Sequence, residues 1–494
     1  MKNQVQLITY ADRLGGTLRG MRELLRGPLK GLFGGVHLLP FFHPSDGADA
    51  GFDPIDHTKV DERLGSWKDV REIGSEVEVM ADVIVNHISS QSPQFLDFSA
   101  KGAKSGYAGM FLTMEGVFPN GATEKELLAI YRPRPGLPFT PMTLADGSRR
   151  ILWTTFTPEQ IDIDVTHPEG MRYLENILGI FAANGIRMVR LDAVGYAIKK
   201  RGRSSFMMEE TFDFIRTFSE QAQRLGLEVL VEVHSYYQRQ IEIARHVDWV
   251  YDFALPPLVL HAFFNRTARD LKHWINIRPV NALTVLDTHD GIGVIDIGPD
   301  TQDRTGHPGL VHERDLAQLV ARIHANSNGE SQRATGSAAS NLDLYQVNCT
   351  FYDALGRDDV QYLLARAIQF FLPGIPQVYY VGLLAGHNDT ALLAETGIGR
   401  DINRHYYTRS EIGSALEKPV VARLLDLIRL RNSHPGFNGE FEVLPSPDEI
   451  LDLQWRNGAE FARLRIDLRS SDHRIEFSRG QGCESFELFA PLEA

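Results

Sequence analysis

The sequence of 494 residues predicts an α/β protein: a (β/α)8 TIM barrel with two inserted subdomains, after strands 3 and 7, and a small C-terminal β domain. The main observation is a series of eight short runs of β-branched and apolar residues, separated by segments with helical periodicity. Several of these runs are apolar throughout, which is typical of parallel strands that helices cover on both faces. The length also fits, because about 150 residues per domain predicts roughly three domains, and a barrel alone takes up about 250 residues.

The eight candidate strands alternate with segments such as 170–184 and 205–225, which have the residue spacing of amphipathic helices. The strands are expected at residues 6–10, 36–40, 79–85, 186–192, 227–234, 249–255, 282–290 and 376–382. Eight strand–helix units of this kind are typical of a closed parallel barrel.

Two intervals in this series are too long to be simple connections. Residues 86–166 follow the third strand and are rich in Pro, Gly and aromatic side chains, whereas residues 291–355 follow the seventh strand and are polar and loop-like. We interpret both as inserted subdomains. Short runs of alternating polarity at 440–444, 451–455 and 461–466 predict the C-terminal β domain. The expected parts are the barrel segments 1–85, 167–290 and 356–437, the insertions 86–166 and 291–355, and the C-terminal domain 438–494.

Charge and hydropathy argue against two classes of partner. The chain has 51 Lys and Arg against 64 Asp and Glu, which gives a formal charge of −13. Nucleic acids and anionic membranes require clustered cations, so neither is expected to bind. The most apolar stretch, 367–386, is interrupted by prolines and is not expected to span a membrane. Residues 1–16 lack the apolar core of a signal peptide, and we therefore expect a cytoplasmic protein.

Three acidic residues lie at the ends of predicted strands. Asp192 ends the fourth strand, Glu232 the fifth and Asp290 the seventh. The carboxyl ends of barrel strands meet at one face, so the three carboxylates are expected to converge. A buried carboxylate needs a partner or a function, because an unpaired buried charge is strongly unfavourable. For each residue alone, a structural ion pair is an equally good interpretation.

Together, the three acids match the chemistry of glycosyl transfer with retention of configuration. That chemistry uses one carboxylate as nucleophile and a second as acid/base, about 5–5.5 Å apart. We assign Asp192 as the nucleophile, because Arg190, two residues back on the same strand face, is expected to keep it ionised. Glu232 is then the acid/base, and Asp290 stabilises developing positive charge.

Four segments resemble, in this order, the signature regions of the alpha-amylase superfamily. They are Asp82-Val-Ile-Val-Asn86-His87, Arg190-Leu-Asp192, Glu232-Val-His234 and His289-Asp290. Within that superfamily the chain is most similar to the sucrose phosphorylases, over nearly its whole length. The motifs that carry this similarity are at residues 6–13, 47–54, 131–136, 195–196, 341–346 and 399–404.

The resemblance implies a double displacement with sucrose as donor and inorganic phosphate as acceptor, which yields α-D-glucose 1-phosphate and fructose. Asp192 would form a covalent β-glucosyl-enzyme, and Glu232 would protonate the departing fructose. The reaction would be reversible and capable of transglucosylation. The resemblance implies no cofactor and no required metal, and it suggests a homodimer.

The resemblance also implies two groups of binding residues. Those for the sugar substrate are Asp49, Phe52, His87, Arg190, Tyr196, His234, His289 and Arg400. Those for phosphate and the acceptor are Tyr131, Arg134, Phe156, Leu342, Asp343, Tyr345 and Gln346. Among them, Arg134 would supply a planar, bidentate donor for an oxyanion.

Several alternatives stay open at this level. Arg400 and Asp49 are also explained by a surface ion pair, and Arg134 by a solvated side chain. Asn86 fills a slot that other members of the superfamily use for calcium, but one oxygen does not make a calcium site. Related phosphorylases of glucosylglycerol, glucosylglycerate or sucrose 6'-phosphate would have the same catalytic residues, as would a hydrolase or transglucosidase. A catalytically inactive binding protein on the same fold is the remaining class.

Overall fold

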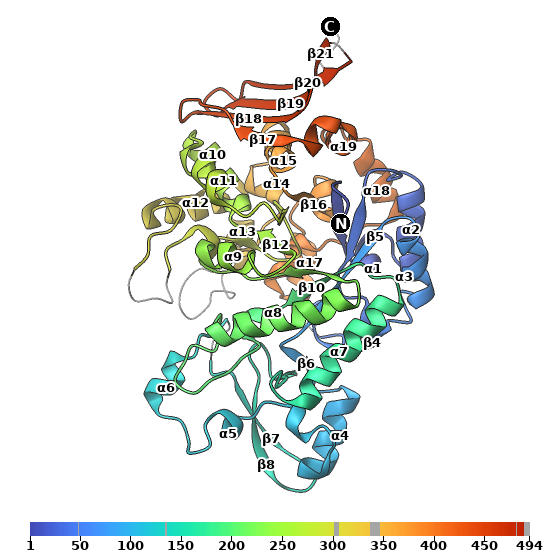
Figure 1. The fold of residues 1–494 in the computed structure, drawn as a ribbon, viewed down its shortest axis with the longest axis vertical. Coiled ribbons are helices and arrows are strands. Elements are labelled where there is room, and N and C mark those ends of the chain that lie inside the picture. Colours follow the sequence, from blue (N-terminus) through green and yellow to red (C-terminus); the bar gives the residue numbers. More distant parts are fainter. Residues whose placement is uncertain (48, 134–135, 301–305, 336–345, 481, 489–494) are drawn as a thin grey trace.

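The computed structural model describes residues 1–47, 49–133, 136–300, 306–335, 346–480 and 482–488 (Figure 1). Eight parallel strands form a closed barrel in the order β1-β16-β13-β12-β11-β10-β5-β2. They are β1 (Gln6–Thr9), β2 (Gly35–Leu38), β5 (Glu78–Ile84), β10 (Met188–Asp192), β11 (Glu228–Val231), β12 (Trp249–Asp252), β13 (Ala282–Thr284) and β16 (Ile375–Tyr379). The predicted barrel is confirmed, and each predicted run overlaps its strand, although β2, β5 and β16 begin one residue earlier than predicted.

Several strands end earlier than predicted. β11 stops at Val231 and β13 at Thr284, so Glu232 and Asp290 lie one and six residues beyond the ends of their strands. The apolar runs continue past the strands because the loops at this face are themselves buried, with Val233, Val285 and Leu286 in the core. The predicted strands were therefore too long, because the buried, apolar loops that carry the acidic residues resemble strands in sequence.

Helices cover the outside of the barrel. The sequence of α7 explains why it forms a helix on the barrel. Pro168 is its first residue, and the side chain of His167 accepts a hydrogen bond from the backbone N–H of Glu169. The apolar face at 174, 177, 178 and 181 is buried. The helices of the barrel segments are α1 (Ala11–Leu14), α2 (Leu18–Arg26), α3 (Trp67–Gly74), α7 (Pro168–Ala183), α8 (Glu209–Arg224), α9 (Tyr237–Ile243), α10 (Leu255–Asn265), α11 (Arg269–Ile277), α15 (Asp359–Phe371), α16 (Tyr380–Leu383), α17 (Thr390–Thr396), α18 (Arg409–Leu416) and α19 (Pro419–Ser433). A short hairpin of β3 (Phe42–Pro44) and β4 (Pro54–Val60) follows β2.

The segment between β5 and α7 builds a small structure at one end of the molecule (Figure 1). It contains β6 (His87–Ser89), α4 (Pro93–Lys101), α5 (Met114–Val117), α6 (Glu124–Ala129), β7 (Phe139–Thr143), β8 (Arg149–Trp153) and β9 (Gln160–Asp162). It has a separate buried apolar cluster of Leu112, Phe118, Ile130 and Trp153. β6 pairs antiparallel with β9, and this ladder fixes His87 and Gln160 next to the barrel.

The described residues after β13 form helices and a short pair of strands, whereas the sequence predicted a polar, loop-like stretch. It contains β14 (Ile292–Gly293), α12 (Glu313–Asn326), α13 (Glu330–Thr335), β15 (Gln346–Val347) and α14 (Phe351–Ala354). α12 was missed by sequence reasoning, although Leu316, Leu319, Val320 and Ile323 have helical spacing and pack on the core. The two-residue pairing of β14 with β15 holds Gln346 opposite Gly293.

The C-terminal sheet lies at the opposite end of the molecule from α4–α6, β7 and β8 (Figure 1). Its five antiparallel strands are β17 (Glu440–Val443), β18 (Ile450–Asn457), β19 (Glu460–Asp467), β20 (His473–Arg479) and β21 (Gly482–Ser485). Sequence reasoning located the first three and missed the last two. The Trp455 indole donates a hydrogen bond of 2.6 Å to the Phe371 carbonyl, which joins the sheet to α15. The domain boundaries given above stay predictions. Among the described residues, every helix is too short or too polar to cross a membrane.

Candidate active site

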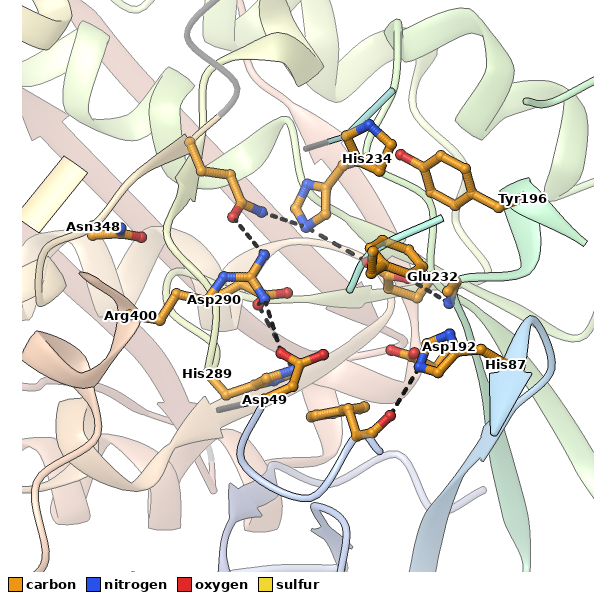
Figure 2. Close-up of a pocket in the computed structure, with 15 residues that line it drawn as sticks. Asp49, His87, Asp192, Tyr196, Glu232, His234, His289, Asp290, Asn348 and Arg400 are labelled. Carbon is orange, nitrogen blue, oxygen red and sulfur yellow. Dashed lines mark hydrogen bonds and ion pairs between the residues drawn. The ribbon is translucent and has the colours of Figure 1, made fainter. Parts of the chain in front are cut away.

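A pocket opens at the carboxyl ends of the barrel strands (Figure 2). Its lining residues are Asp49, Phe52, His87, Pro133, Phe156, Asp192, Ala193, Tyr196, Glu232, His234, His289, Asp290, Gln346, Asn348 and Arg400. The three predicted catalytic acids therefore share one pocket. They come from separate strand ends, as expected for a barrel of this kind.

Asp192 is held by a buried arginine, Arg190, which was predicted to bind substrate but is not among the residues that line the pocket. Arg190 is 2% exposed, and its Nη1 lies 2.8 Å from Asp192 Oδ1 and 2.6 Å from Asp82 Oδ1. The second guanidinium nitrogen, Nη2, lies 3.8 Å from Glu232 Oε1. Asp82 also contacts His37 Nε2 at 3.0 Å. One cation thus connects three carboxylates, and its closest contacts are with Asp82 and Asp192.

Arg190 was expected to keep Asp192 ionised, but burial and Glu232 also affect the pKa of Asp192. Burial raises the pKa of the Asp192 carboxyl well above its usual range, Arg190 opposes this rise, and the neighbouring Glu232 adds to it. Carboxylates this close compete for negative charge. Arg190 lies 2.8 Å from Asp192 but 3.8 Å from Glu232, so its position favours the negative charge on Asp192.

Glu232 has weaker polar contacts than the other two acids. Its Oε2 accepts a hydrogen bond of 3.3 Å from the backbone N–H of Ala193, and its Oε1 lies 3.8 Å from His234 Nε2. Ala193 has a φ of 53°, which is unusual for a residue with a side chain and costs on the order of 1 kcal/mol. This left-handed turn, directly after Asp192, points the N–H of Ala193 at Glu232.

Asp290 is paired with Arg400. The distance from Arg400 Nη1 to Asp290 Oδ1 is 2.9 Å, whereas the distance to Asp49 Oδ1 is 4.0 Å. Although burial acts to raise it, the Arg400 guanidinium and the nearby His289 and His234 hold the pKa of Asp290 well below its usual range. Arg400 and Asp49 are 23% and 25% exposed and line the pocket, which differs from a surface ion pair.

Aromatic and imidazole rings form the apolar walls of the pocket. Phe52 stacks on His289 with ring centroids 4.8 Å apart, and Phe156 meets both His87 and Tyr196 edge-to-face at 5.2 Å. Burial lowers the pKa of His87 and lowers that of His289 well below its usual range, so both imidazoles are neutral at pH 7. Such rings can donate or accept hydrogen bonds from sugar hydroxyls.

The predicted acceptor residues are brought together only in part. Gln346 and Phe156 line the pocket, and the Gln346 amide nitrogen lies 3.1 Å from His234 Nε2. Tyr131 stands behind the pocket wall, with its ring 4.7 Å from Phe206 and 6.2 Å from Tyr196. The other four predicted acceptor residues lie outside the described residues: Arg134, Leu342, Asp343 and Tyr345.

The structure adds residues that sequence reasoning did not assign to the site. Gln160 Nε2 donates to Asp49 Oδ2 at 3.0 Å and lies 3.1 Å from His87 Nε2. Asp82 contacts Arg190, and Asp296 contacts His234. Only Asp82 had a usable signal, as an acid within the apolar run of the third strand.

Asn86 is hydrogen-bonded to a buried lysine. The Lys199 side chain is 1% exposed, and its ammonium lies 2.6 Å from Asn86 Oδ1 and 2.5 Å from Asp162 Oδ2. This contact joins the end of β5 to β9, so Asn86 holds the base of the segment inserted after β5. Elsewhere in the described chain, Glu232, His234 and Asp290 place one potential ligand atom each within 4.8 Å of one another. The absence of a required metal stays a prediction.

Comparison with known proteins gives a consistent result. The family model of the alpha-amylase catalytic domain matches residues 6–248. The chain is 59% identical over 487 residues to a sucrose phosphorylase of Agrobacterium vitis, which covers 98% of this chain and 99% of that protein. It is 57% identical over 494 residues to a sucrose phosphorylase of Bifidobacterium adolescentis, which covers 100% of this chain and 96% of that protein.

A solved structure extends the similarity to three dimensions. The crystal structure of a sucrose 6F-phosphate phosphorylase from Thermoanaerobacter thermosaccharolyticum has a TM-score of 0.90 to this chain, with 39% identity, and the match covers 98% of both chains. The barrel, the inserted segments and the C-terminal sheet are therefore shared over nearly the full length.

Proposed function

This chain belongs to the alpha-amylase family and, within it, to the sucrose phosphorylases, and we propose that it transfers the glucosyl group of sucrose reversibly to inorganic phosphate, with retention of configuration. It is a glycoside phosphorylase, a hexosyltransferase. The products of the proposed reaction are α-D-glucose 1-phosphate and fructose. The homodimer and the cytoplasmic location stay predictions from the sequence.

In the first half-reaction, a carboxylate oxygen of Asp192 attacks the anomeric carbon of the glucosyl unit. The bond from that carbon to the fructosyl oxygen breaks, and the oxygen keeps the electron pair and takes the proton of Glu232. Asp192 becomes a glucosyl ester, and Glu232 becomes a carboxylate. Asp290, ionised beside Arg400, stabilises positive charge on the sugar ring.

In the second half-reaction, a phosphate oxygen attacks the anomeric carbon from the side that fructose left. The ester bond to Asp192 breaks and returns the electron pair to that carboxylate, while Glu232 takes a proton from phosphate. Two inversions at the same carbon give retention. When a sugar hydroxyl replaces phosphate, the same steps produce transglucosylation.

The observation that carries this proposal is the unequal pairing of the three acids in one pocket. Asp192 and Asp290 each lie within 3 Å of an arginine, at 2.8 and 2.9 Å, whereas Arg190 and His234 approach Glu232 only to 3.8 Å. Two acids are thus placed to carry charge, and the third is placed to carry a proton. A retaining mechanism needs this division between nucleophile and acid.

Sequence identity supports sucrose over a phosphorylated donor. The chain is 57–59% identical to two sucrose phosphorylases but 39% identical to the sucrose 6F-phosphate phosphorylase. The alternatives are a related phosphorylase of glucosylglycerol or glucosylglycerate and a sucrose hydrolase. The assay described next distinguishes them from a sucrose phosphorylase.

The test is incubation of the purified protein with sucrose, with and without phosphate, and measurement of glucose 1-phosphate, glucose and fructose. We expect phosphate-dependent glucose 1-phosphate in amounts equal to fructose, with the α anomer as the initial product by NMR. Glucose and fructose in equal amounts, independent of phosphate, would identify a hydrolase, and no turnover of sucrose would exclude this donor.

Substitution of the nucleophile tests the covalent step. Asp192→Ala should abolish glucose 1-phosphate formation, because no glucosyl ester can form. Asp213→Ala, which removes an exposed carboxylate paired with Arg216 on α8, is the matched control and should retain full activity. Appreciable glucose 1-phosphate from Asp192→Ala would refute the assignment.

A further inference from the structure

A buried aspartate outside the catalytic trio is bonded to His234. Asp296 lies just after β14 and is 0% exposed. Its Oδ2 lies 2.8 Å from His234 Nδ1, and its Oδ1 accepts hydrogen bonds from the backbone N–H of Ser235 at 3.1 Å and from Gln240 Nε2 at 2.9 Å. Both carboxylate oxygens are therefore occupied by protein donors, and Asp296 itself does not line the pocket.

These contacts fix the orientation of the His234 ring. Because Nδ1 faces Asp296, the other nitrogen, Nε2, faces the pocket, 3.8 Å from Glu232 Oε1 and 3.1 Å from the Gln346 amide nitrogen. The ring is stacked on Phe253, with centroids 3.8 Å apart and 15° between the planes. Rotation of the imidazole would break both the stack and the bond to Asp296.

Gly293 packs closely against the hydrogen bond between His234 and Asp296. A Cβ on Gly293 of β14 would lie 2.2 Å from Asp296 Oδ2 and 3.0 Å from His234 Nδ1. No side chain fits there without displacing the pair. The glycine therefore permits the strand to pass directly over the hydrogen bond.

The charged groups that face His234 are mainly acidic. They are Asp296 after β14, Glu232 after β11 and Asp290 after β13, while Arg400 pairs with Asp290 at 2.9 Å and lies 3.4 Å from the Gln346 amide oxygen. Burial acts to lower the pKa of His234, but Asp296, Glu232 and Asp290 together outweigh burial and raise that pKa above its usual value.

We propose that Asp296 is a positioning residue for the phosphate half-reaction, which acts through His234 by directing Nε2 at the acceptor and by supporting a proton on the ring. This inference rests on the proposed phosphorolysis. After fructose leaves, the negative charge has moved from Asp192, now an ester, to Glu232, which borders the acceptor side. Phosphate then approaches a carboxylate, and a protonated His234 beside Glu232 offsets the repulsion and donates a hydrogen bond to a phosphate oxygen, which takes the place of the Gln346 amide nitrogen that lies 3.1 Å from Nε2. Water is neutral and does not need this compensation.

The test compares phosphorolysis with hydrolysis in the full-length enzyme. Asp296→Asn keeps the shape of the side chain and removes its charge. We expect its KM for phosphate, at saturating sucrose, to rise about tenfold or more, the size of one charge-assisted hydrogen bond. The slow hydrolysis of sucrose without phosphate should stay within about twofold, since it does not need the cation.

The pH profile separates this role from general damage to the fold. Removal of the Asp296 charge lowers the pKa of His234, so the alkaline decline of kcat/KM for phosphate should begin at a lower pH in Asp296→Asn than in the wild type. The titration of phosphate itself is common to both enzymes and cancels in the comparison. The profile of hydrolysis should not move.

Two further variants complete the design. Asp270→Asn on α11 removes a carboxylate that lies 3.6 Å from another buried histidine, His261, outside the pocket, and it should leave the KM for phosphate unchanged. Gly293→Ala should reproduce the selective loss with phosphate by displacing the pair, and it provides an independent test if Asp296→Asn does not fold. Equal losses in phosphorolysis and hydrolysis, with no displacement of the pH profile, would overturn the inference. A wild-type enzyme that forms no glucose 1-phosphate would instead overturn the proposed function.

Discussion

Replacement of Arg190 by Met is expected to destabilise the protein by about 3–5 kcal/mol, the usual cost of removing one partner from a buried ion pair. The guanidinium is 2% exposed and contacts Asp82 and Asp192 at 2.6 and 2.8 Å. Met fills most of the volume of the arginine stem, so the loss is mainly electrostatic. The change removes the arginine from two carboxylates, and Asp82, which is 0% exposed, keeps its contact with His37 Nε2.

The pKa of Asp82 gives an independent scale for part of this cost. Although burial acts to raise it, His37 and Arg190 lower that pKa from 3.8 to about 2. At 1.36 kcal/mol per unit, the shift corresponds to about 2 kcal/mol in favour of the folded state. Because the pKa is depressed in the folded protein, this contribution is present above about pH 4 and is lost as the pH falls through about 2. The remainder comes from Asp192, which loses its closest cation and must then stay buried as a carboxylate or take up a proton.

The assay is guanidinium-induced unfolding at pH 7, followed by tryptophan fluorescence and circular dichroism. Arg172→Met on α7, which removes an exposed arginine paired with Glu169, is the matched control and should leave the unfolding free energy nearly unchanged. The double variant Asp82→Asn/Arg190→Met should be more stable than Arg190→Met by about 1 kcal/mol or more, because one orphan charge is gone. Equal effects of Arg190→Met and Arg172→Met would refute the reasoning.

Three further predictions concern the acid/base and the inserted segment. Glu232→Gln should slow turnover of sucrose by about 100-fold or more, but should slow turnover of α-glucosyl fluoride much less, because fluoride leaves without a proton; equal losses on both donors in initial-rate assays would contradict the acid role. Lys199→Met should destabilise the protein by about 3 kcal/mol, since Asp162 stays buried without its cation. EDTA should leave the thermal midpoint of the wild type unchanged, because the ammonium of Lys199 already bridges Asn86 and Asp162. A midpoint that falls with EDTA would show that a metal supports this region.

The barrel was predictable because its strands repeat one physical pattern. Each strand is buried on both faces, so each reads as a short apolar run, and α7 has a Pro at its start and an apolar stripe of helical spacing. The same signal failed at strand ends, where buried loops read like strands. It also failed at α12, where two buried residues, Leu319 and Ile323, stand among charged ones. β20 was missed because only two of its seven residues, Ile475 and Ser478, are buried, and β21 was missed because it is exposed throughout and lies at the edge of the sheet.

The catalytic acids were predictable for a related reason. Asp192, Glu232 and Asp290 each follow an apolar run, and a charge at that place in the sequence is conspicuous. Gln160 and Asp296 had no such signal, because their partners His87 and His234 are 73 and 62 residues away and meet them only through β6–β9 pairing and the turn after β14. Contacts across inserted segments depend on the path of the chain, which local patterns do not encode.

In the sequence, only the neighbouring Arg190 separated Asp192 from the other two acids, and the structure adds the distance of each acid to a cation. Arg190 at 2.8 Å and Arg400 at 2.9 Å attach fixed positive charge to Asp192 and Asp290, whereas the nearest ring nitrogen to Glu232 belongs to His234, at 3.8 Å, whose own charge depends on a proton. Arginine stays charged throughout the reaction and suits acids that must be anionic when sucrose binds. Histidine can gain a proton, and it therefore suits the acid whose charge appears only after fructose leaves. The pairing of each carboxylate thus follows the stage of the proposed reaction at which its negative charge is needed.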